Sequence, residues 1–259
     1  MNGLKIRYLE SGKENNRHVL FIHGLGSSAD RWLGIPDALS ENFHTISLDL
    51  PGFGKSDKPV TMDYTIENFR YIVIDFINKL ALNDGKVSIV GHSLGGYIAA
   101  EVIMTNKIQA ERLVLIDSSG MLKKPTPLLE EYLRAAMNPT KDKVRKVFEQ
   151  MVADPARIPL KLVEGFITRI NLPNAKYAFK STLENSANTQ IELERLKLID
   201  SMPTLIIWGI KDKVIPPEHS EFFKESIERS RIEMIKDAGH APFAEKPDKI
   251  CEMLRTFLT

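Results

Sequence analysis

The sequence predicts an α/β fold, with a mostly parallel central sheet of about seven strands that helices flank on both faces. Short apolar runs alternate with amphipathic helical patterns along most of the chain, and several of these runs end in glycine-containing loops. Parallel strands need such crossover helices between them. The alternation stops between residues 120 and 188, where helical patterns follow one another without a strand pattern.

Five strands are expected in the first part of the chain. The run at 4–9 alternates apolar and charged residues, as a half-exposed edge strand does. The other four runs are largely apolar and predict buried strands at 18–22, 43–48, 87–90 and 112–117. Thr65 is a suitable N-cap for the second of three helices that we expect here, at 29–39, 66–80 and 97–106.

Four consecutive helical patterns occupy the middle block, at 128–137, 141–153, 160–170 and 175–185. Because they break the βαβ rhythm, we interpret residues 120–188 as a helical cap inserted over one end of the sheet, and not as ordinary sheet-flanking helices. The core domain then consists of residues 1–119 and 189–259. Its second part is expected to contain strands at 204–208 and 231–235 and helices at 218–228 and 247–258.

The most informative stretch reads Gly-His-Ser-Leu-Gly at 91–95, between a predicted strand and a predicted helix. In a G-x-S-x-G pattern, a sharp turn exposes the serine Oγ, and the glycines remove Cβ atoms that would clash. The N-terminus of the following helix favours an anion forming on the substrate. The pattern predicts that Ser93 is a nucleophile; the alternative is a glycine-rich turn whose serine only caps the helix.

Three more loops carry polar or glycine-rich sequence at expected carboxyl ends of strands, where ligands bind in open α/β sheets: 23–27, 209–212 and 239–240. Ser93, Asp212 and His240 follow in the order that accompanies a G-x-S-x-G turn. His240 would take the serine proton, and Asp212 would orient the imidazole and stabilise its cation. Asp117, also at a strand end, is the alternative acid.

Five motifs in this order resemble the α/β-hydrolase superfamily, specifically its capped serine esterases and C–C hydrolases. They cover nearly the whole chain and lie at 23–26, 49–56, 91–96, 208–212 and 239–240. The resemblance implies an α/β-hydrolase fold, favours Asp212 over Asp117 and assigns an oxyanion hole to the backbone N–H groups of Leu25 and Leu94. It implies no organic cofactor and no metal. Members usually begin with one or two further strands, so we expect a trimmed sheet edge here.

The other histidines have simpler interpretations. His18 and His44 begin strands and should lie at the opposite end of the sheet, whereas His219 begins a surface helix. His23 is expected to brace its loop, and the turn needs nothing of His92 beyond its size. Five large side chains either line an acyl pocket or belong to the core: Trp32, Phe53, Met121, Met137 and Met151.

Composition excludes several classes of protein. The formal net charge is +1, with no basic stripe of the kind that nucleic-acid binding requires. The single cysteine, Cys251, forms no internal disulfide, and no Cys/His cluster has zinc-site spacing. No signal-like or membrane-length apolar run occurs. We therefore expect a cytoplasmic monomer or homodimer that binds a small acyl ester, and neither nucleic acid nor membrane.

A serine at position 93 disfavours dehalogenase and epoxide-hydrolase chemistry, which need a carboxylate there. We expect hydrolysis of carboxylic esters with short to medium acyl chains through an acyl-enzyme on Ser93. The first alternative is C–C bond hydrolysis of a vinylogous diketone by the same residues. That reaction would recruit an arginine, such as Arg157 or Arg169, for a substrate carboxylate. The second alternative is a ligand-sensing α/β-hydrolase-like receptor.

Overall fold

The computed structural model describes residues 3–82 and 87–259, apart from the side chain of Arg157. Its described strands form one seven-stranded sheet in the order β1-β3-β2-β4-β5-β6-β7. Only the pair of β1 and β3 is antiparallel. The strands are β1 Tyr8–Ser11, β2 His18–Ile22, β3 His44–Leu48, β4 Val87–His92, β5 Ala110–Ile116, β6 Thr204–Gly209 and β7 Ser230–Ile235. The predicted fold class and sheet are confirmed.

The first strand lies further along the chain than its sequence pattern predicted. Residues 4–7 follow the loop after β3: the backbone N–H of Lys5 donates to Asp57 (2.8 Å), and that of Arg7 donates to the Ser56 hydroxyl (2.9 Å). Only residues 8–11 pair with β3, so β1 is a short edge strand. Residues 1–2, part of the segment from which a trimmed edge was expected, lie outside the described chain.

Two helices predicted in the first part of the chain differ in outcome: one begins at its expected cap, and the other is broken. The Thr65 hydroxyl accepts from the backbone N–H of Asn68 and caps α2 (Ile66–Lys79) as predicted. The helix predicted at 29–39 is broken into a 3-10 turn (Ala29–Trp32) and α1 (Ile35–Leu39). Leu33 and Gly34 lie between them in the left-handed region (φ 51° and 81°), which no α-helix can include.

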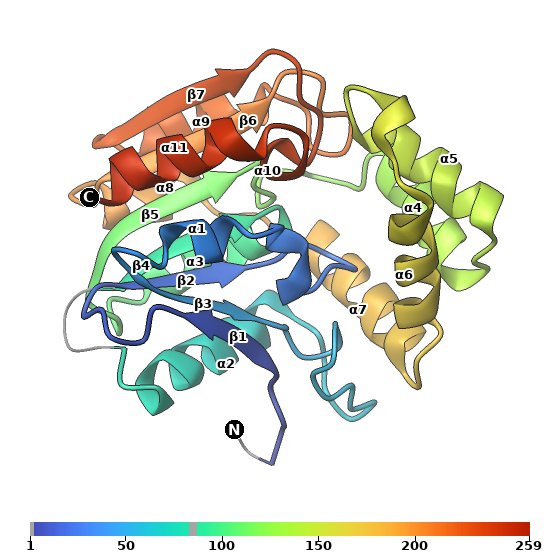
Figure 1. Cartoon of the computed structure of the whole chain (residues 1–259), viewed down its shortest axis with the longest axis horizontal. Helices are drawn as coiled ribbons and strands as arrows, with labels where there is room; N and C mark the ends of the chain where they lie inside the picture. The colour runs from blue at the N-terminus through green and yellow to red at the C-terminus, as the bar shows by residue number, and fades with distance from the viewer. Residues whose placement is uncertain (1–2, 83–86) are drawn as a thin grey trace.

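Between β5 and β6 the chain forms α-helices and no strand, as predicted for 120–188. We name residues 127–187 the helical segment; it contains α4 (Pro127–Met137), α5 (Lys141–Met151), α6 (Leu160–Ile170) and α7 (Ala175–Ala187). Figure 1 shows it standing beside the carboxyl ends of the parallel strands. The α-helices that follow are α8 (Leu193–Leu196), α9 (His219–Ser226), α10 (Pro242–Glu245) and α11 (Pro247–Leu258). Sequence periodicity had missed the two four-residue helices, α8 and α10.

Two apolar layers cover the sheet, because alternate residues of each strand point to opposite faces. On β2, Leu20 and Ile22 join the layer that contains α2, α3 (Leu94–Met104) and α9. Val19 and Phe21 join the layer that contains α1 and α11. Trp32, Phe53 and Met121 belong to these layers, so their core interpretation holds.

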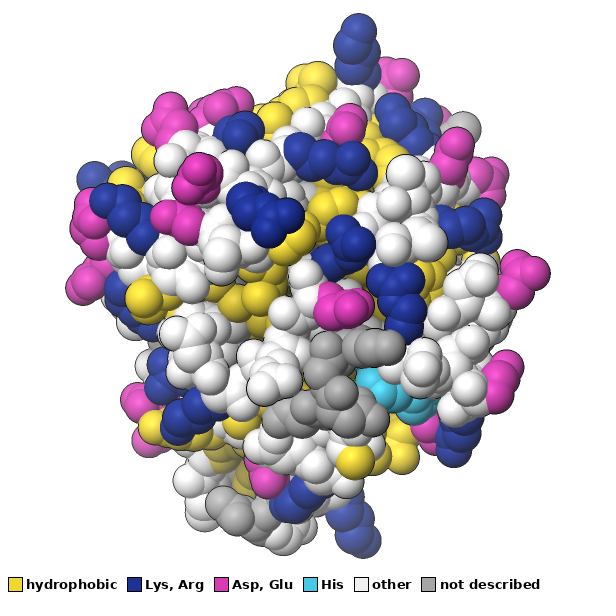
Figure 2. Space-filling model, turned by 90° about the vertical axis from the view of Figure 1, so that its left-hand side faces the viewer, with side chains coloured by type: hydrophobic (Ala, Val, Ile, Leu, Met, Phe, Trp, Pro, Cys, Tyr) yellow, Lys and Arg dark blue, Asp and Glu magenta, His cyan; other side chains and the backbone are white. Residues whose placement is uncertain are grey.

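The surface away from the helical segment carries mixed charge. Figure 2 shows acidic and basic side chains interspersed over the face where the strands begin. Among the residues that the structure describes, no helix combines the length and apolar character that crossing a bilayer would require.

Candidate active site

The turn between β4 and α3 holds Ser93 in a strained conformation, with φ 52° and ψ −119°. The backbone packs so closely around Gly91 and Gly95 that no side chain fits at either position. A Cβ at Gly95 would lie 2.1 Å from the Ile22 carbonyl oxygen, and one at Gly91 would lie 2.3 Å from that of Gly95. This turn projects the Ser93 side chain beyond the carboxyl end of β4.

Ser93, His240 and Asp212 form a chain of hydrogen bonds across three loops. The Oγ of Ser93 lies 3.0 Å from Nε2 of His240, and Nδ1 of His240 lies 2.7 Å from Oδ2 of Asp212. All three residues are buried. The Ser93 hydroxyl makes no helix-capping bond, so the alternative of a mere capping serine is wrong.

Backbone donors fix the orientation of Asp212. Its Oδ1 accepts from the N–H groups of Val214 (2.7 Å) and Ile215 (3.1 Å), which leaves Oδ2 directed at the imidazole. A carboxylate held in this way can keep Nδ1 of His240 protonated and Nε2 free to accept a proton.

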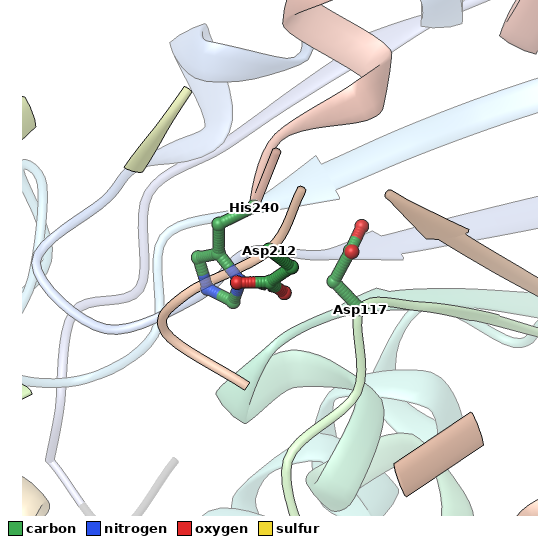
Figure 3. A group of neighbouring side chains, drawn as sticks. All are labelled: Asp117, Asp212 and His240. Atoms are coloured by element: carbon green, nitrogen blue, oxygen red, sulfur yellow. Dashed lines mark hydrogen bonds and ion pairs between the residues drawn. The ribbon is translucent and has the colours of Figure 1, made fainter. Parts of the chain in front are cut away.

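Asp117 lies beside this pair but is bound differently (Figure 3). Its Oδ1 accepts from the Gly209 N–H at 2.9 Å, whereas its buried Oδ2 has no hydrogen-bond partner among the residues that the structure describes. Burial, and then the charge of Asp212, raise the pKa of Asp117 well above the usual range. His240 is bonded to Asp212 and not to Asp117, so the geometry favours Asp212 as the orienting carboxylate.

Asp117, Asp212 and His240 also bring three potential metal-ligand atoms within 4.8 Å of one another. Their hydrogen bonding does not suit a metal. Nδ1 of His240 is bonded to Asp212, and the raised pKa of Asp117 disfavours the ionised form that a metal ligand needs. The donor set fits proton transfer better than metal coordination.

Two other histidines brace the site. Nε2 of His23 accepts from the Leu50 N–H (3.0 Å) while Nδ1 donates to the Gly24 carbonyl (2.8 Å), which is the bracing role expected of it. Nε2 of His92 donates to the His240 carbonyl (2.7 Å), a support that sequence reasoning missed. Burial lowers the pKa of both rings, which are therefore neutral.

The two peptides expected to form an oxyanion hole flank Ser93. Leu94 is the first residue of α3, so its N–H has no acceptor within the helix. The loop of Leu25 lies against Ser93: a Cβ at Gly24 would be 3.1 Å from that of Ser93. The Tyr132 hydroxyl donates to the Leu25 carbonyl oxygen at 3.4 Å and so connects this loop to α4.

A pocket with about 800 Å³ of empty space opens over Ser93 and His240. Its walls come mostly from apolar side chains of the helical segment. Met151 is among the lining residues, whereas Met137 is not. The apolar and aromatic lining consists of Leu25, Leu129, Tyr132, Phe148, Met151, Val152, Ile158, Leu162, Phe166, Val214, Ala241 and Phe243.

Two arginines line the same pocket: Arg31 and Arg169. Within the described residues, neither guanidinium has an acidic side chain at ion-pair distance, and Nε of Arg169 is buried without a hydrogen-bond partner. Burial lowers the pKa of both, and the charge of Arg169 lowers that of Arg31 further. Arg169 had been considered from the sequence; Arg31 had not, because nothing in its local sequence indicates that it faces a pocket. The side chain of Arg157, the other candidate, lies outside the described part.

Comparisons with known proteins agree with this architecture. A family model described as alpha/beta hydrolase fold matches residues 17–247. Lipase 3 of Moraxella sp. (strain TA144) is 31% identical over 250 residues, which cover 94% of this chain and 78% of the relative. The 2-hydroxy-6-oxo-6-(2'-aminophenyl)hexa-2,4-dienoic acid hydrolase of Metapseudomonas resinovorans is 28% identical, with 99% and 88% covered.

Solved structures of hydrolases superpose on almost the whole chain. A serine hydrolase involved in carbazole degradation superposes with a TM-score of 0.85 at 27% identity, covering 99% of this chain and 95% of that one. A meta-cleavage product hydrolase from Pseudomonas fluorescens IP01 superposes with a TM-score of 0.89 at 24% identity, over 98% and 94%. The motifs, the sheet order and the family match lead to one conclusion: this chain is a hydrolase that belongs to the α/β-hydrolase family.

Proposed function

We propose that the protein is a serine hydrolase that cleaves carboxylic esters through an acyl-enzyme on Ser93. The observation that carries the proposal is the hydrogen-bonded chain from Ser93 through His240 to Asp212 at the tip of a strained turn. Outside such a chain, a serine hydroxyl is a weak nucleophile at neutral pH.

In the first half of the reaction, Nε2 of His240 takes the proton of the Ser93 hydroxyl as Oγ attacks the ester carbonyl. The negative charge moves to the carbonyl oxygen, where the N–H groups of Leu25 and Leu94 would stabilise it. His240 then returns the proton to the departing alkoxide, and the acyl-enzyme remains. Asp212 stabilises the transient imidazolium throughout.

In the second half, water replaces the alcohol. His240 removes a proton from the water as its oxygen attacks the acyl carbonyl, and it then protonates Oγ as the carboxylic acid leaves. Every proton transfer uses the same nitrogen, Nε2. No group from outside the chain is required other than water.

The shape and lining of the pocket support the proposal that the substrates are esters with short to medium acyl chains. Its apolar walls, supplied mainly by the helical segment, match an alkyl chain beside Ser93. Several relatives are lipases by name, including Lipase 1 of Psychrobacter immobilis. In this proposal residues 120–188 act as a cap that closes the pocket.

A second candidate is hydrolysis of a C–C bond in an acidic diketone, and the two arginines favour it. Arg31 and Arg169 place two positive charges in the pocket, where an anionic group of a substrate would be bound. The relative from Metapseudomonas resinovorans is named for an acid substrate of this kind. The same charges would equally select an ester that bears a carboxylate at the far end of its acyl chain.

A fluorophosphonate probe with peptide mapping tests the reaction type. We expect labelling on Ser93, none in Ser93→Ala, and normal labelling in the matched control Ser119→Ala. A folded wild-type protein that neither reacts with the probe nor hydrolyses p-nitrophenyl esters would contradict the enzyme proposal and favour the ligand-sensing alternative.

A substrate panel tests the second candidate. The p-nitrophenyl monoester of glutaric acid and p-nitrophenyl pentanoate differ by a terminal carboxylate on chains of equal length. We expect Arg169→Gln to raise KM for the acidic ester about tenfold relative to the neutral one, with Arg134→Gln on the exposed face of α4 as the control. Equal effects on both esters would contradict an anion site. Turnover of a 2-hydroxy-6-oxohexa-2,4-dienoate would establish C–C hydrolysis.

A further inference from the structure

The loop that carries His240 rests directly on the helical segment. The backbone N–H of His240 donates to the Met151 carbonyl oxygen at 2.7 Å. The preceding residue is glycine because the two backbones touch: a Cβ at Gly239 would lie 2.3 Å from that same oxygen and 2.9 Å from Cα of Val152. The C-terminal end of α5 therefore defines where the His240 backbone can lie.

One carboxylate joins the two sides of this contact. Oε1 of Glu245 accepts from the Gly239 N–H, and Oε2 accepts from the Ala153 N–H, both at 2.7 Å. Gly239 belongs to the loop that carries His240 (residues 236–241, the histidine loop), whereas Ala153 follows α5. Glu245 itself lies on α10, just after that loop. Bonds of this length between a carboxylate and backbone N–H groups are charge-assisted and stronger than neutral ones.

We propose that Glu245 is a positioning residue for His240, and that it makes docking of the helical segment a condition for catalysis. The inference rests on the proposed role of His240 as the base. Nε2 of His240 must stay near 3.0 Å from the Ser93 oxygen to take its proton. Its backbone is held by Met151 directly and by Ala153 through Glu245, so movement of this segment also moves the base.

This arrangement couples pocket closure to reactivity. Met151 and Val152 line the pocket as well as contacting the histidine loop. A substrate that holds the helical segment against the histidine loop would shorten the hydrogen bonds that position His240. Movement of the helical segment away from the loop would leave Ser93 without its base. Hydrolysis would then be restricted to substrates that fill the pocket.

The test compares Glu245→Gln, Ala153→Pro and the matched control Glu252→Gln, which changes an exposed glutamate on α11. Gln keeps the size of Glu245 but places an NH₂ donor against one of the two N–H groups. Pro removes the Ala153 N–H and spares the bond of Gly239, and the extended Val152 (ψ 159°) tolerates a following proline. Rates are expressed per active site, counted by fluorophosphonate labelling carried to completion, so that loss of folded protein is not counted.

We expect Glu245→Gln to lower kcat on p-nitrophenyl butyrate about tenfold with KM changed less than about twofold. Ala153→Pro should lower kcat in the same way, and Glu252→Gln should match the wild type. An unchanged kcat per site in Glu245→Gln would overturn the proposal. A loss in Glu245→Gln with none in Ala153→Pro would overturn the coupling to the helical segment. A folded wild type that neither reacts with the fluorophosphonate nor hydrolyses p-nitrophenyl butyrate would instead overturn the proposed function, and this inference with it.

Discussion

Replacing each of the two buried aspartates by asparagine separates their roles. In Asp212→Asn the amide oxygen is expected to accept the same two hydrogen bonds, from the backbone N–H groups of Val214 and Ile215, that Oδ1 of Asp212 accepts. The NH₂ group then points at Nδ1 of His240. Nδ1 must then accept, so Nε2 carries the proton and faces Ser93 as a donor. The serine loses its base.

The magnitude follows from this change of tautomer. A protease triad that carries the same substitution loses about 10⁴ in kcat, or about 5.4 kcal/mol of transition-state stabilisation. We expect a loss of this order in Asp212→Asn. In Asp117→Asn the amide oxygen still accepts from the Gly209 N–H, and the bonds of His240 to Asp212 and Ser93 are untouched, so the loss should stay within about threefold.

The assay is kcat/KM on p-nitrophenyl butyrate per titrated active site, with circular dichroism to establish that each variant is folded. The two variants change the same atoms in neighbouring buried groups, so each is the control for the other. A larger loss in Asp117→Asn than in Asp212→Asn would refute the reasoning and assign the orienting carboxylate to the end of β5.

Three other predictions concern stability and selectivity. Because its pKa is raised in the folded state, Asp117 contributes stability at low pH, and this contribution is lost as pH rises through the folded-state pKa. The urea midpoint of Asp117→Asn should therefore exceed that of the wild type by more at about pH 8 than at about pH 5. Gly95→Ala should abolish both folding and activity, because its Cβ would collide with the Ile22 backbone; soluble, active protein would contradict this. Exchanging residues 120–188 for the corresponding block of a lipase relative should change the preferred acyl length on graded p-nitrophenyl esters, and an unaltered profile would count against the cap.

The parts of the molecule that depend on local patterns were predictable. Apolar runs located the strands of the sheet, and the 91–95 motif located the strained turn, because both signals lie within a few consecutive residues. The chain order of Ser93, Asp212 and His240 was enough to expect their meeting. The break at Leu33 and Gly34 was not predictable from helical periodicity, since Leu33 is not a residue that favours a left-handed backbone.

The features that sequence reasoning missed depend on contacts between distant segments. Arg31 comes from the 3-10 turn Ala29–Trp32, and only the folded chain brings it into one pocket with Arg169 of α6, which the sequence did offer as a candidate. The bridge made by Glu245 joins residues 92 positions apart in sequence. No spacing rule relates such pairs, because the two groups that Glu245 joins are backbone N–H groups, which carry no residue signature.

The paired arginines have a practical consequence for finding ligands. Keeping two like charges largely buried in one pocket costs folding free energy, and natural proteins retain such costs where function needs them. An anion that occupies the cavity would relieve the repulsion and bind only the native state, so it would raise the melting temperature. A thermal-shift survey of small organic acids, with their methyl esters as uncharged counterparts, is therefore a direct route to the chemical character of the natural substrate.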